Sequence, residues 1–444
     1  LAIRLSIQLT ALVPNPDLLI ALTAGPARSD ELQARLGLSQ PAVSRLVTEY
    51  AADILVVGRA RATRYARRRP LPGLSPDLPV YRVNTDGDAH EMGLLSPIHG
   101  GMVFEDREQR RSDIYPGLPW FLDDMRPQGF MGRNFVRRHE ALGLPARLAD
   151  WNDDHALIAI ARRGDDLAGN LIVGEDAFTR WTQTQHGDVI DAADREFRYP
   201  RLAEQALAGE LPGSSAGGEQ PKFTAQVRDL NGIRHVLVKF CGALSTPVGR
   251  RWADLLVCEH LALQTVAEAG LPAAESTLIE AGGRLFLEVT RFDRVGARGR
   301  LGLISLGAVD DPLIGPRKDW SQTARALVGL RRLSRQDADH IAWLQAFGTC
   351  IANTDMHFGN LSLFHDGRRS LGLAPAYDML PMRYAPAADG SVNTPEWRTP
   401  APPPFAVSQW ASARSAAAQF WQRVAADSSV SSDMRALARA TRFE

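Results

Sequence analysis

Residues 353–360, which read Asn-Thr-Asp-Met-His-Phe-Gly-Asn, constrain this chain more than any other segment. An acid, Asp355, is followed by His357 and Asn360, and a second acid, Asp378, comes after a short apolar run. Phosphoryl-transfer sites have this layout, because one Asp orients and deprotonates the attacking hydroxyl while an Asn and a later Asp hold Mg²⁺ against the phosphates. The simpler interpretation is a polar loop in which Asp355 caps a turn and His357 packs. Residues upstream are needed to choose between the two interpretations.

A loop of small residues lies upstream, at residues 214–222 (Ser-Ser-Ala-Gly-Gly-Glu-Gln-Pro-Lys), before a strand pattern at residues 223–227. Such a loop lets backbone N–H groups approach phosphate oxygens, and Lys222 adds positive charge. It is not a Walker A motif, because the G-x-x-x-x-G-K-[ST] spacing is absent. Taken alone, the loop is interpreted more simply as a flexible hairpin.

A lysine, Lys239, lies inside an apolar strand pattern at residues 235–240. Lysines are seldom found in such a run unless they are paired, and a phosphate-pairing lysine on a strand is what a kinase small lobe requires. Residues 255–267 then have the apolar spacing of a helix, with Glu259 near its start; Glu259 either pairs with Lys239 or lies in solvent. The alternative for Lys239 is an edge-strand lysine that prevents aggregation.

Residues 284–294 form a strand pattern that runs into a polar turn, where the chain of a bilobal kinase passes from the small to the large lobe. There Phe292 would line the apolar slot for the base, although an ordinary strand end is the alternative. A glycine loop, a strand lysine, a helix glutamate, a hinge strand, the D-x-H-x-x-N loop and a metal aspartate thus occur in kinase order. This ordered set is the main reason to predict a kinase-like fold.

Residues 12–69 predict a winged helix-turn-helix domain. A helical run at residues 17–24 ends at Gly-Pro, and Ser29 is expected to cap a second helix at residues 30–36. A third helical pattern follows, with Ser39 as its expected N-cap and a proline in its first turn. Its outward-facing residues suit base edges and phosphates, and they are Gln40, Ser44, Arg45 and Thr48.

Two short strand patterns, residues 54–57 and 63–66, flank a Gly-containing turn as the hairpin of a wing would. The most basic stretch of the chain accompanies them and comprises Arg59, Arg61, Arg64, Arg67, Arg68 and Arg69. Helix-turn-helix spacing together with adjoining positive charge predicts DNA binding. The alternative is a small helical domain that makes protein contacts.

The 444 residues suffice for roughly two to four units. The net charge is zero, so binding to nucleic acid must depend on a local patch. We find no apolar run of about 18 residues or more, which predicts no transmembrane helix, and the first residues lack a signal-peptide pattern. Cys241, Cys258 and Cys350 are isolated, which argues against a zinc site or a disulfide framework and predicts a cytoplasmic location.

The expected architecture is α+β in three parts. Residues 1–75 form the winged helix-turn-helix domain, residues 78–293 a small-lobe region with the glycine loop and strand lysine, and residues 294–444 a mainly helical lobe with the catalytic loop. A Pro-rich stretch, residues 70–76, links the first two parts. Residues 80–200 contain little recognisable chemistry and are interpreted as scaffold.

Residues 80–440 resemble the HipA family of serine/threonine kinases. The segments that carry the resemblance occur in the family's order, and they are residues 215–222, 238–239, 291–294, 353–360 and 377–378. In the usual arrangement of the family, a separate helix-turn-helix antitoxin binds operator DNA and the kinase. The fused N-terminal domain of this chain resembles instead the YjjJ/HipH-like branch.

The resemblance implies a bilobal protein-kinase-like fold that binds ATP and Mg²⁺. Asp355 would be the catalytic base, Asn360 and Asp378 would bind the metal, and Lys239 would hold the phosphates. The implied nucleotide-binding residues, of which Thr290 to Phe292 form the adenine hinge, are Gly217, Gly218, Gln220, Lys222, Lys239, Thr290, Arg291, Phe292, His357, Asn360, Tyr377 and Asp378.

The chain departs from the family pattern at two positions. Thr290 stands where the family often carries Glu, and Pro221 stands where Glu is common and removes a backbone donor. Ser215, with Ser214 as the adjacent alternative, falls where the family autophosphorylates its loop. A phosphate there would place about two negative charges beside the nucleotide phosphates, so loss of ATP binding would follow.

The predicted function is therefore an ATP- and Mg²⁺-dependent serine/threonine protein kinase, regulated by a fused DNA-binding domain and by loop phosphorylation. One alternative is a small-molecule kinase, and another is a transcription regulator whose kinase-like domain senses a ligand. The expected partners are ATP, operator DNA and a protein substrate, which the family resemblance suggests is an aminoacyl-tRNA synthetase. A second copy of the chain is a further expected partner, and a membrane is not.

Overall fold

The computed structural model describes residues 17–184, 188–209, 220–315, 319–367 and 370–441. The predicted loop residues Ser214, Ser215, Gly217 and Gly218 lie outside the described residues. The chain forms two compact units, one of Leu1–Val80 with Met92–Pro119 and one of Tyr81–Glu91 with Trp120–Glu444. Strands β3 (Leu78–Val83) and β4 (Ala89–Ile98) each run through both units.

The first unit begins with short helices around one small core. They are α1 (Asp17–Ala21), the 3-10 turn η1 (Leu22–Ala24), α2 (Ser29–Leu36) and α3 (Gln40–Glu49). Their buried apolar residues include Leu18, Leu32 and Val43. The expected helices are thus confirmed, with one correction: Ser29 is the first residue of α2 and not its cap. Arg28 occupies the cap position, and its backbone N–H donates to the Glu31 carboxylate (3.0 Å).

A hairpin follows α3, as the sequence predicts. It consists of β1 (Ile54–Val57), the turn η2 (Ala60–Ala62) and β2 (Arg64–Arg67), and a separate antiparallel ladder joins β4 to β5 (Gly101–Asp106) and β6 (Arg111–Tyr115). Three arginines of the basic stretch stabilise the unit itself. Arg68 pairs with Asp77 (2.5 Å), while Arg67 and Arg69 donate to backbone carbonyls. The other three, Arg59, Arg61 and Arg64, are exposed.

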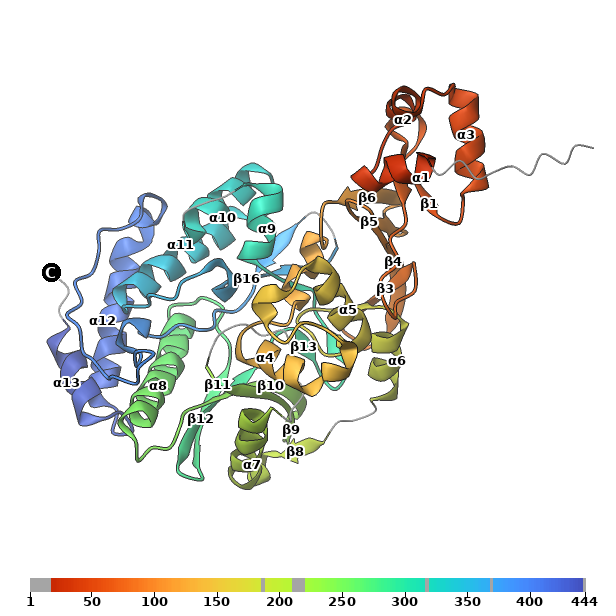
Figure 1. Cartoon of the computed structure of the whole chain (residues 1–444). Helices are drawn as coiled ribbons and strands as arrows, with labels where there is room; N and C mark the ends of the chain where they lie inside the picture. Colours follow the sequence, from red (N-terminus) through yellow and green to blue (C-terminus); the bar gives the residue numbers. More distant parts are fainter. Residues whose placement is uncertain (1–16, 185–187, 210–219, 316–318, 368–369, 442–444) are drawn as a thin grey trace, which may run out of the picture. The chain divides into compact units, whose positions relative to one another are not determined.

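The second unit contains a five-stranded sheet with a helix on each face (Figure 1). The strands lie in the order β11 (Ser276–Ala281), β12 (Arg284–Thr290), β10 (Gly232–Phe240), β9 (Lys222–Asp229) and β8 (Val189–Asp191). Neighbouring strands are antiparallel, except that β8 and β9 are parallel. Helix α7 (Arg195–Ala208) covers one face and α8 (Pro247–Glu268) the other.

The pleat of the sheet decides which side chains meet which helix. Successive residues of a strand point to opposite faces. In β10, Val236, Val238 and Phe240 therefore pack toward α7, and Lys239 points to the opposite face, toward α8. In β12, Phe286 joins the α7 side and its sequence neighbours Leu285 and Leu287 join the α8 side. The apolar run around Lys239 thus packs one face of β10 into the α7 core, while Leu237 and Lys239 on the other face line a cavity.

The C-terminal part of the second unit is mainly helical. Its helices are α9 (Leu306–Leu313), α10 (Trp320–Gly329), α11 (Arg335–Cys350), α12 (Trp410–Ala426) and α13 (Ser432–Ala440), with the 3-10 turns η7 (Phe358–Asn360), η8 (Met382–Tyr384) and η9 (Pro404–Gln409). Side-chain caps fix the starts of two long helices, since Thr246 accepts from Gly249 N–H and Ser334 accepts from Asp337 N–H. Helices α8, α11 and α12 pack around the largest core (Figure 1).

A small antiparallel sheet lies beside these helices, and the predicted catalytic loop immediately precedes its strand β16. Its strands are β15 (Leu303–Ser305), β16 (Ser362–His365) and β17 (Leu371–Leu373), in that order, and β13 (Arg294–Val295) pairs with β14 (Gly299–Arg300) just before it. Residues 353–360 connect the end of α11 to β16. The loop is thereby held at both ends by regular structure.

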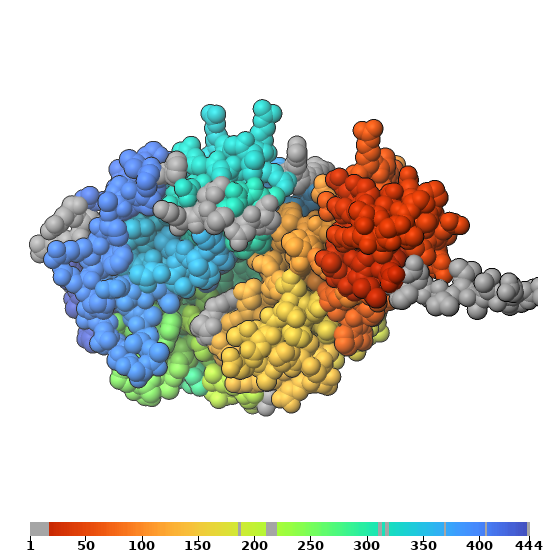
Figure 2. Space-filling model, turned by 45° about the horizontal axis from the view of Figure 1, so that its top comes forward, coloured from red at the N-terminus to blue at the C-terminus, as the bar shows by residue number. Residues whose placement is uncertain are grey.

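The remaining elements of the second unit come from the segment interpreted as scaffold. They are η3 (Trp120–Met125), α4 (Gly129–Arg138), η4 (Glu140–Leu142), η5 (Leu148–Asp150), α5 (Asp153–Arg163), β7 (Leu171–Val173), α6 (Glu175–Gln183) and η6 (Ala192–Asp194). Figure 2 shows the yellow part of this segment on one side of the unit and the cyan to blue helices on the other.

We expect the α8 core to dominate the stability of the second unit. Leu256→Ala removes a fully buried side chain from α8 and should lower the free energy of unfolding by roughly 2–5 kcal/mol. The matched control is Leu230→Ala, which alters a fully exposed leucine in the β9–β10 turn and should change stability by less than about 0.5 kcal/mol. Urea denaturation followed by tryptophan fluorescence measures both, and equal effects would contradict this assignment of the core.

Candidate nucleotide-binding site

A cavity of about 820 Å³ brings the predicted site residues together. It lies between the five-stranded sheet and the helical part of the second unit. The described residues that were predicted to bind nucleotide or metal, or to act as base, all line it, and they are Gln220, Lys222, Lys239, Thr290, Arg291, Phe292, Asp355, His357, Asn360, Tyr377 and Asp378. Segments more than a hundred residues apart in the sequence therefore share one cavity.

A buried ammonium group lies between two carboxylates on the inner wall. Lys239 Nζ donates to Glu259 Oε1 (2.5 Å) and Oε2 (2.7 Å), and it also pairs with Asp378. Lys239 is 4% exposed and Glu259 is fully buried. The predicted Lys239–Glu259 pair is confirmed, because both residues project from the facing surfaces of β10 and α8.

Mutual attraction keeps the charged groups of this cluster ionised. Burial alone would lower the pKa of Lys239, but Asp378 and Glu259 raise it well above its ordinary value. Burial would likewise raise the pKa of Asp378, but Lys239 and Lys222 lower it below its ordinary value. Lys222 lies directly opposite Lys239 in the β9–β10 ladder and is buried. Two ammonium groups and an ionised carboxylate therefore face one end of the cavity.

The backbone at Asp378 and at Ala352 adopts a conformation that residues with side chains disfavour. Asp378 has a φ of 53° and Ala352, just before the loop, has a φ of 60°. Left-handed backbone at a residue other than glycine costs free energy and persists only where its surroundings enforce it, and such residues gather at functional sites. At Asp378 the enforcing contacts include the backbone N–H, which donates to Glu259 (3.2 Å).

Asn353 joins the two acidic segments and was given no role in the sequence analysis. Its Oδ1 accepts from the backbone N–H of Asp355 (3.0 Å), and its Nδ2 donates to the backbone carbonyl of Asp378 (3.2 Å). The residue is 6% exposed, so both bonds are shielded from water. Asn353 thus sets the distance between the predicted base and the predicted metal ligand. Its position two residues before the acid is a signal that sequence reasoning could have used.

The rest of the loop is folded by short-range hydrogen bonds. Asn360 Nδ2 donates to the carbonyl of Asp355 (2.8 Å), and His357 Nδ1 accepts from Gly359 N–H (3.0 Å). Tyr377 donates its hydroxyl to the carbonyl of Gly359 (2.8 Å). Asp355 itself is exposed. Its carboxylate is therefore accessible to a substrate from solvent.

The oxygen atoms at this end of the cavity fit a hard divalent cation. Mg²⁺ prefers carboxylate and amide oxygens, usually one or two from protein with waters and substrate phosphates completing the shell. Asp378 offers a carboxylate, and Asn360 uses its Nδ2 in the loop and leaves its amide oxygen for a ligand. No group of three or more His, Cys, Asp or Glu residues that could hold a metal exists within the described ranges.

The opposite end of the cavity is apolar and contains the predicted hinge. Leu237, Val289, Phe292 and Leu303 line it, and the rings of Phe292 and Tyr377 are 5.8 Å apart. The backbone N–H groups of Thr290 and Arg291 already donate to other carbonyls, those of Glu275 and His235. Among the hinge residues, the Phe292 N–H has no hydrogen-bond acceptor in the described part of the chain.

The side chain of Arg291 is committed to a buried ion-pair network. It pairs with Asp166 (3.1 Å) and with Asp293 (3.0 Å), and Arg294 pairs with the same two acids. Burial would raise the pKa of Asp293, but Arg291 and Arg294 lower it to about 2. This network ties residues 165–169 to the turn after β12. Arg291 therefore lines the cavity while its guanidinium fixes the turn.

Sequence reasoning missed the contribution of the segment interpreted as scaffold. Asp124, Gln128, Gly129 and Ala168 all line the cavity. Asp124 Oδ2 accepts from the backbone N–H of Ser305 (2.5 Å). No motif marks these residues, because the spacing that brings them to the cavity is set by the fold and not by the local sequence.

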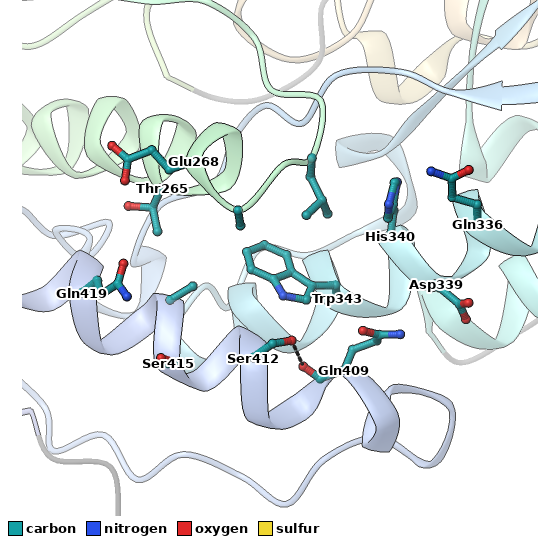
Figure 3. A pocket seen from close by; sticks show the side chains of 13 residues that line it. Thr265, Glu268, Gln336, Asp339, His340, Trp343, Gln409, Ser412, Ser415 and Gln419 are labelled. Atoms are coloured by element: carbon teal, nitrogen blue, oxygen red, sulfur yellow. Dashed lines mark hydrogen bonds between the residues drawn. The ribbon is translucent and has the colours of Figure 1, made fainter.

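A second cavity, of about 810 Å³, has a different chemistry (Figure 3). It lies between α8, α11 and α12, and Trp343 forms its floor while glutamine and serine side chains surround it. Of the described residues that line it, none is lysine or arginine, and Glu268 and Asp339 are acidic. It therefore offers no lysine or arginine to the phosphates of a nucleoside triphosphate. Of these two cavities of similar size, the one with Lys222 and Lys239 fits a nucleotide.

Comparisons with known proteins agree with this geometry. The family model of the YjjJ-like toxin middle domain matches residues 74–182, and that of the HipA-like C-terminal domain matches residues 214–441. Toxin YjjJ of Escherichia coli (strain K12) is 40% identical over 424 residues, which are 94% of this chain and 94% of that protein. The chain belongs to the HipA family of toxins, in its YjjJ-like branch.

A solved structure shows the same fold. It is a chain of the Shewanella oneidensis MR-1 toxin–antitoxin complex of HipA, HipB and its operator DNA, with a TM-score of 0.52 and 13% identity over 82% of this chain and 94% of that chain. At this identity the likeness concerns the HipA fold alone. Within this HipA-family chain, Gln220 to Asp378 belong to the C-terminal family domain, and Asp124 to Ala168 belong to the YjjJ-like middle domain.

Two further expectations can be compared with the structure. Cys241, Cys258 and Cys350, which the sequence predicts not to form a disulfide framework, are buried free thiols. In the part of the chain that the structure describes, no helix combines the length and the apolar character needed to cross a membrane.

Lys239→Met is expected to lower the free energy of unfolding by roughly 3–5 kcal/mol, because it leaves a buried Glu259 without its partner. The double variant Lys239→Met/Glu259→Leu removes both charges and should regain most of that stability. Urea denaturation of the two variants beside the wild type makes the comparison. If the double variant is as unstable as the single one, lost packing and not an unpaired charge explains the effect.

Proposed function

We propose that this HipA-family chain is an ATP- and Mg²⁺-dependent serine/threonine protein kinase. The observation that carries the proposal is that Lys239, Asp378 and Asp355 line one cavity, with Glu259 fixing the lysine. The apolar end, with Phe292 and Leu303, suits a purine, and the cationic end suits phosphates. Catalysis of phosphoryl transfer consists mostly of positioning and charge stabilisation, which such a cavity supplies.

In the proposed reaction, Asp355 accepts the proton of a serine or threonine hydroxyl. The hydroxyl oxygen forms a bond to the γ-phosphorus of ATP, the bond from that phosphorus to the β–γ bridging oxygen breaks, and ADP leaves. The exposed position of Asp355 supports this role, because the acceptor hydroxyl has to reach it from a second protein. Asn353 positions the base through the Asp355 backbone N–H.

Asp378 and Asn360 are the residues proposed to hold Mg²⁺, which would neutralise charge on the β- and γ-phosphates. Lys239 and Lys222 are proposed to pair with phosphate oxygens from the β9–β10 side. The salt bridge between Lys239 and Asp378 keeps both groups ionised and in place before the substrate arrives. His357 and Tyr377 are proposed to border the nucleotide between these groups.

Ser215, or the adjacent Ser214, is proposed as the autophosphorylation site. Both serines lie outside the described residues, and the support comes from Gln220 and Lys222, which follow the loop in the sequence and line the cavity. A phosphate on the loop would bring about two negative charges close to the cationic end of the cavity. Phosphorylation there would thus compete with ATP for the same lysines.

The test of the kinase proposal is phosphate transfer from labelled ATP and Mg²⁺ by wild type and Asp355→Asn. The variant is expected to lose roughly 10²- to 10⁴-fold in rate, because the amide cannot accept the hydroxyl proton. The matched control Asp433→Asn changes an exposed aspartate on α13 that does not line the cavity, and its rate should equal that of wild type. Substrates are found by mass spectrometry of phosphosites gained in cells that express each form.

Several outcomes would reject the proposal. Equal labelling by wild type and Asp355→Asn would remove Asp355 from the reaction. Labelling of a small molecule and of no protein would favour a small-molecule kinase. Binding of ATP without any transfer would favour a regulator whose kinase-like domain senses a ligand.

We further propose that the first unit binds operator DNA as a winged helix-turn-helix. Helices α1 to α3 followed by the β1–β2 hairpin support this assignment. On α3, Val43 and Val47 are buried, while the four residues predicted to contact DNA, Gln40, Ser44, Arg45 and Thr48, are exposed. Arg59, Arg61 and Arg64 add exposed positive charge at the hairpin.

Arg45→Ala is expected to weaken binding to DNA from the chain's own promoter and to reduce the salt slope of the binding constant by about 1, because one phosphate contact is lost. The control Arg111→Ala removes an exposed arginine of β6 that pairs with Asp113 (2.9 Å) and should leave binding unchanged. Mobility shifts at several salt concentrations measure both. Binding that does not respond to salt would argue against phosphate contacts.

A further inference from the structure

Asp124 supplies a carboxyl group to the cavity from outside the kinase-like motifs. It belongs to η3, in the segment that matches the YjjJ-like middle domain. The backbone N–H of Ser305 donates to its Oδ2 (2.5 Å), and Ser305 also lines the cavity. A carboxylate has about four acceptor positions, so Ser305 leaves capacity for a further donor.

A chain of contacts connects Asp124 to the aromatic residues of the cavity. Its partner Ser305 lies on β15, opposite Ser362 of β16, and the Ser362 hydroxyl bonds with that of Tyr377 (2.7 Å). Tyr377 in turn lies beside Phe292. Burial raises the pKa of Tyr377, and the charges of Asp378 and Asp124 raise it further, so the Asp124 carboxylate acts on the Tyr377 phenol.

Charge decides which part of a nucleotide this carboxyl group can face. A carboxylate beside phosphate groups would repel them. Lys222 and Lys239, which suit phosphates, belong to β9 and β10, whereas Asp124 is bonded to Ser305 of β15. The donors of a nucleotide that remain are the ribose hydroxyls and the amino group of the base. A buried acceptor is favourable where such a donor meets it and costly where none does.

We propose that Asp124, held by Ser305, forms a nucleoside-binding subsite whose carboxyl group accepts a hydrogen bond from a ribose hydroxyl or from the amino group of the base. The inference rests on the proposed function, because it assumes that a nucleotide occupies this cavity. The middle domain thereby takes part in nucleotide recognition and is more than scaffold. Burial raises the pKa of Asp124 and the bonds from Ser305 oppose that rise, so a donor on the ligand would favour the ionised form.

Calorimetry of the full chain with Mg·ATP tests the subsite with Asp124→Asn. The asparagine keeps an oxygen for the Ser305 N–H and turns an NH₂ group, which cannot accept, toward the ligand. ATP should bind roughly tenfold more weakly, the effect of one hydrogen bond to a charged group. The matched control Asp123→Asn alters the neighbouring aspartate, which pairs with Arg126 (2.6 Å) and does not line the cavity, and it should bind ATP as wild type does.

Three further ligands locate the donor. Tripolyphosphate lacks the nucleoside and should bind wild type and Asp124→Asn equally. If the donor is the 2′-hydroxyl, 2′-deoxy-ATP will bind both proteins equally; if it is the amino group, inosine triphosphate will do so. Unchanged ATP affinity in Asp124→Asn, or an equal loss with tripolyphosphate, overturns the subsite. Failure of the wild type to bind ATP would instead reject the proposed function.

Discussion

The geometry of the cavity in the second unit depends on one buried ammonium group. Lys239 holds Glu259 of α8 and Asp378 after β17 at the same point, although the three residues are distant in sequence. An unpaired buried charge costs several kcal/mol, so Lys239 and Glu259, which are both buried, are stable there only as partners. The cluster therefore couples the geometry of the cavity to the pairing of these charges. A site that must meet its ligand with charges already in place is preorganised by this coupling.

The alternating pattern of the sheet explains how one strand serves both a core and a site. In β10, the side chains that face α7 are apolar, and Lys239 lies on the face that meets α8. The same alternation in β9 turns Phe223 to the α7 core and Lys222 to the cavity. A shift of either strand by one residue would exchange these faces, so register is fixed by burial as well as by hydrogen bonds.

The sequence was sufficient to predict site residues where a chemically distinctive side chain occurs in a regular motif order. The order of the motifs placed Lys239, Glu259, Phe292, Asp355 and Asp378 in one site, and the structure brings them together. The sequence was insufficient to predict residues that reach the cavity only through the tertiary fold. Nothing local distinguishes Asp124, which lines the cavity, from its neighbour Asp123, which pairs with Arg126. Likewise the arginine run predicted one basic surface, but residues 67–69 are used inside the first unit because acceptors lie beside them in the fold.

Two charged clusters border the cavity. One holds the predicted hinge in position, and the other can bind a charged ligand. In the first, Arg291 and Arg294 share Asp166 and Asp293, so that each arginine has two acidic partners, and the turn before Phe292 is fixed. In the second, two lysines border the cavity where Asp378 is partly accessible, with its side chain 23% exposed. A phosphate or a cation can add to the second cluster without breaking the fold, whereas a ligand at the first would have to displace a bond that holds the hinge. The apolar slot is thus kept in place by arginines and acids that pair with one another, and ligand charge can meet the two lysines and Asp378.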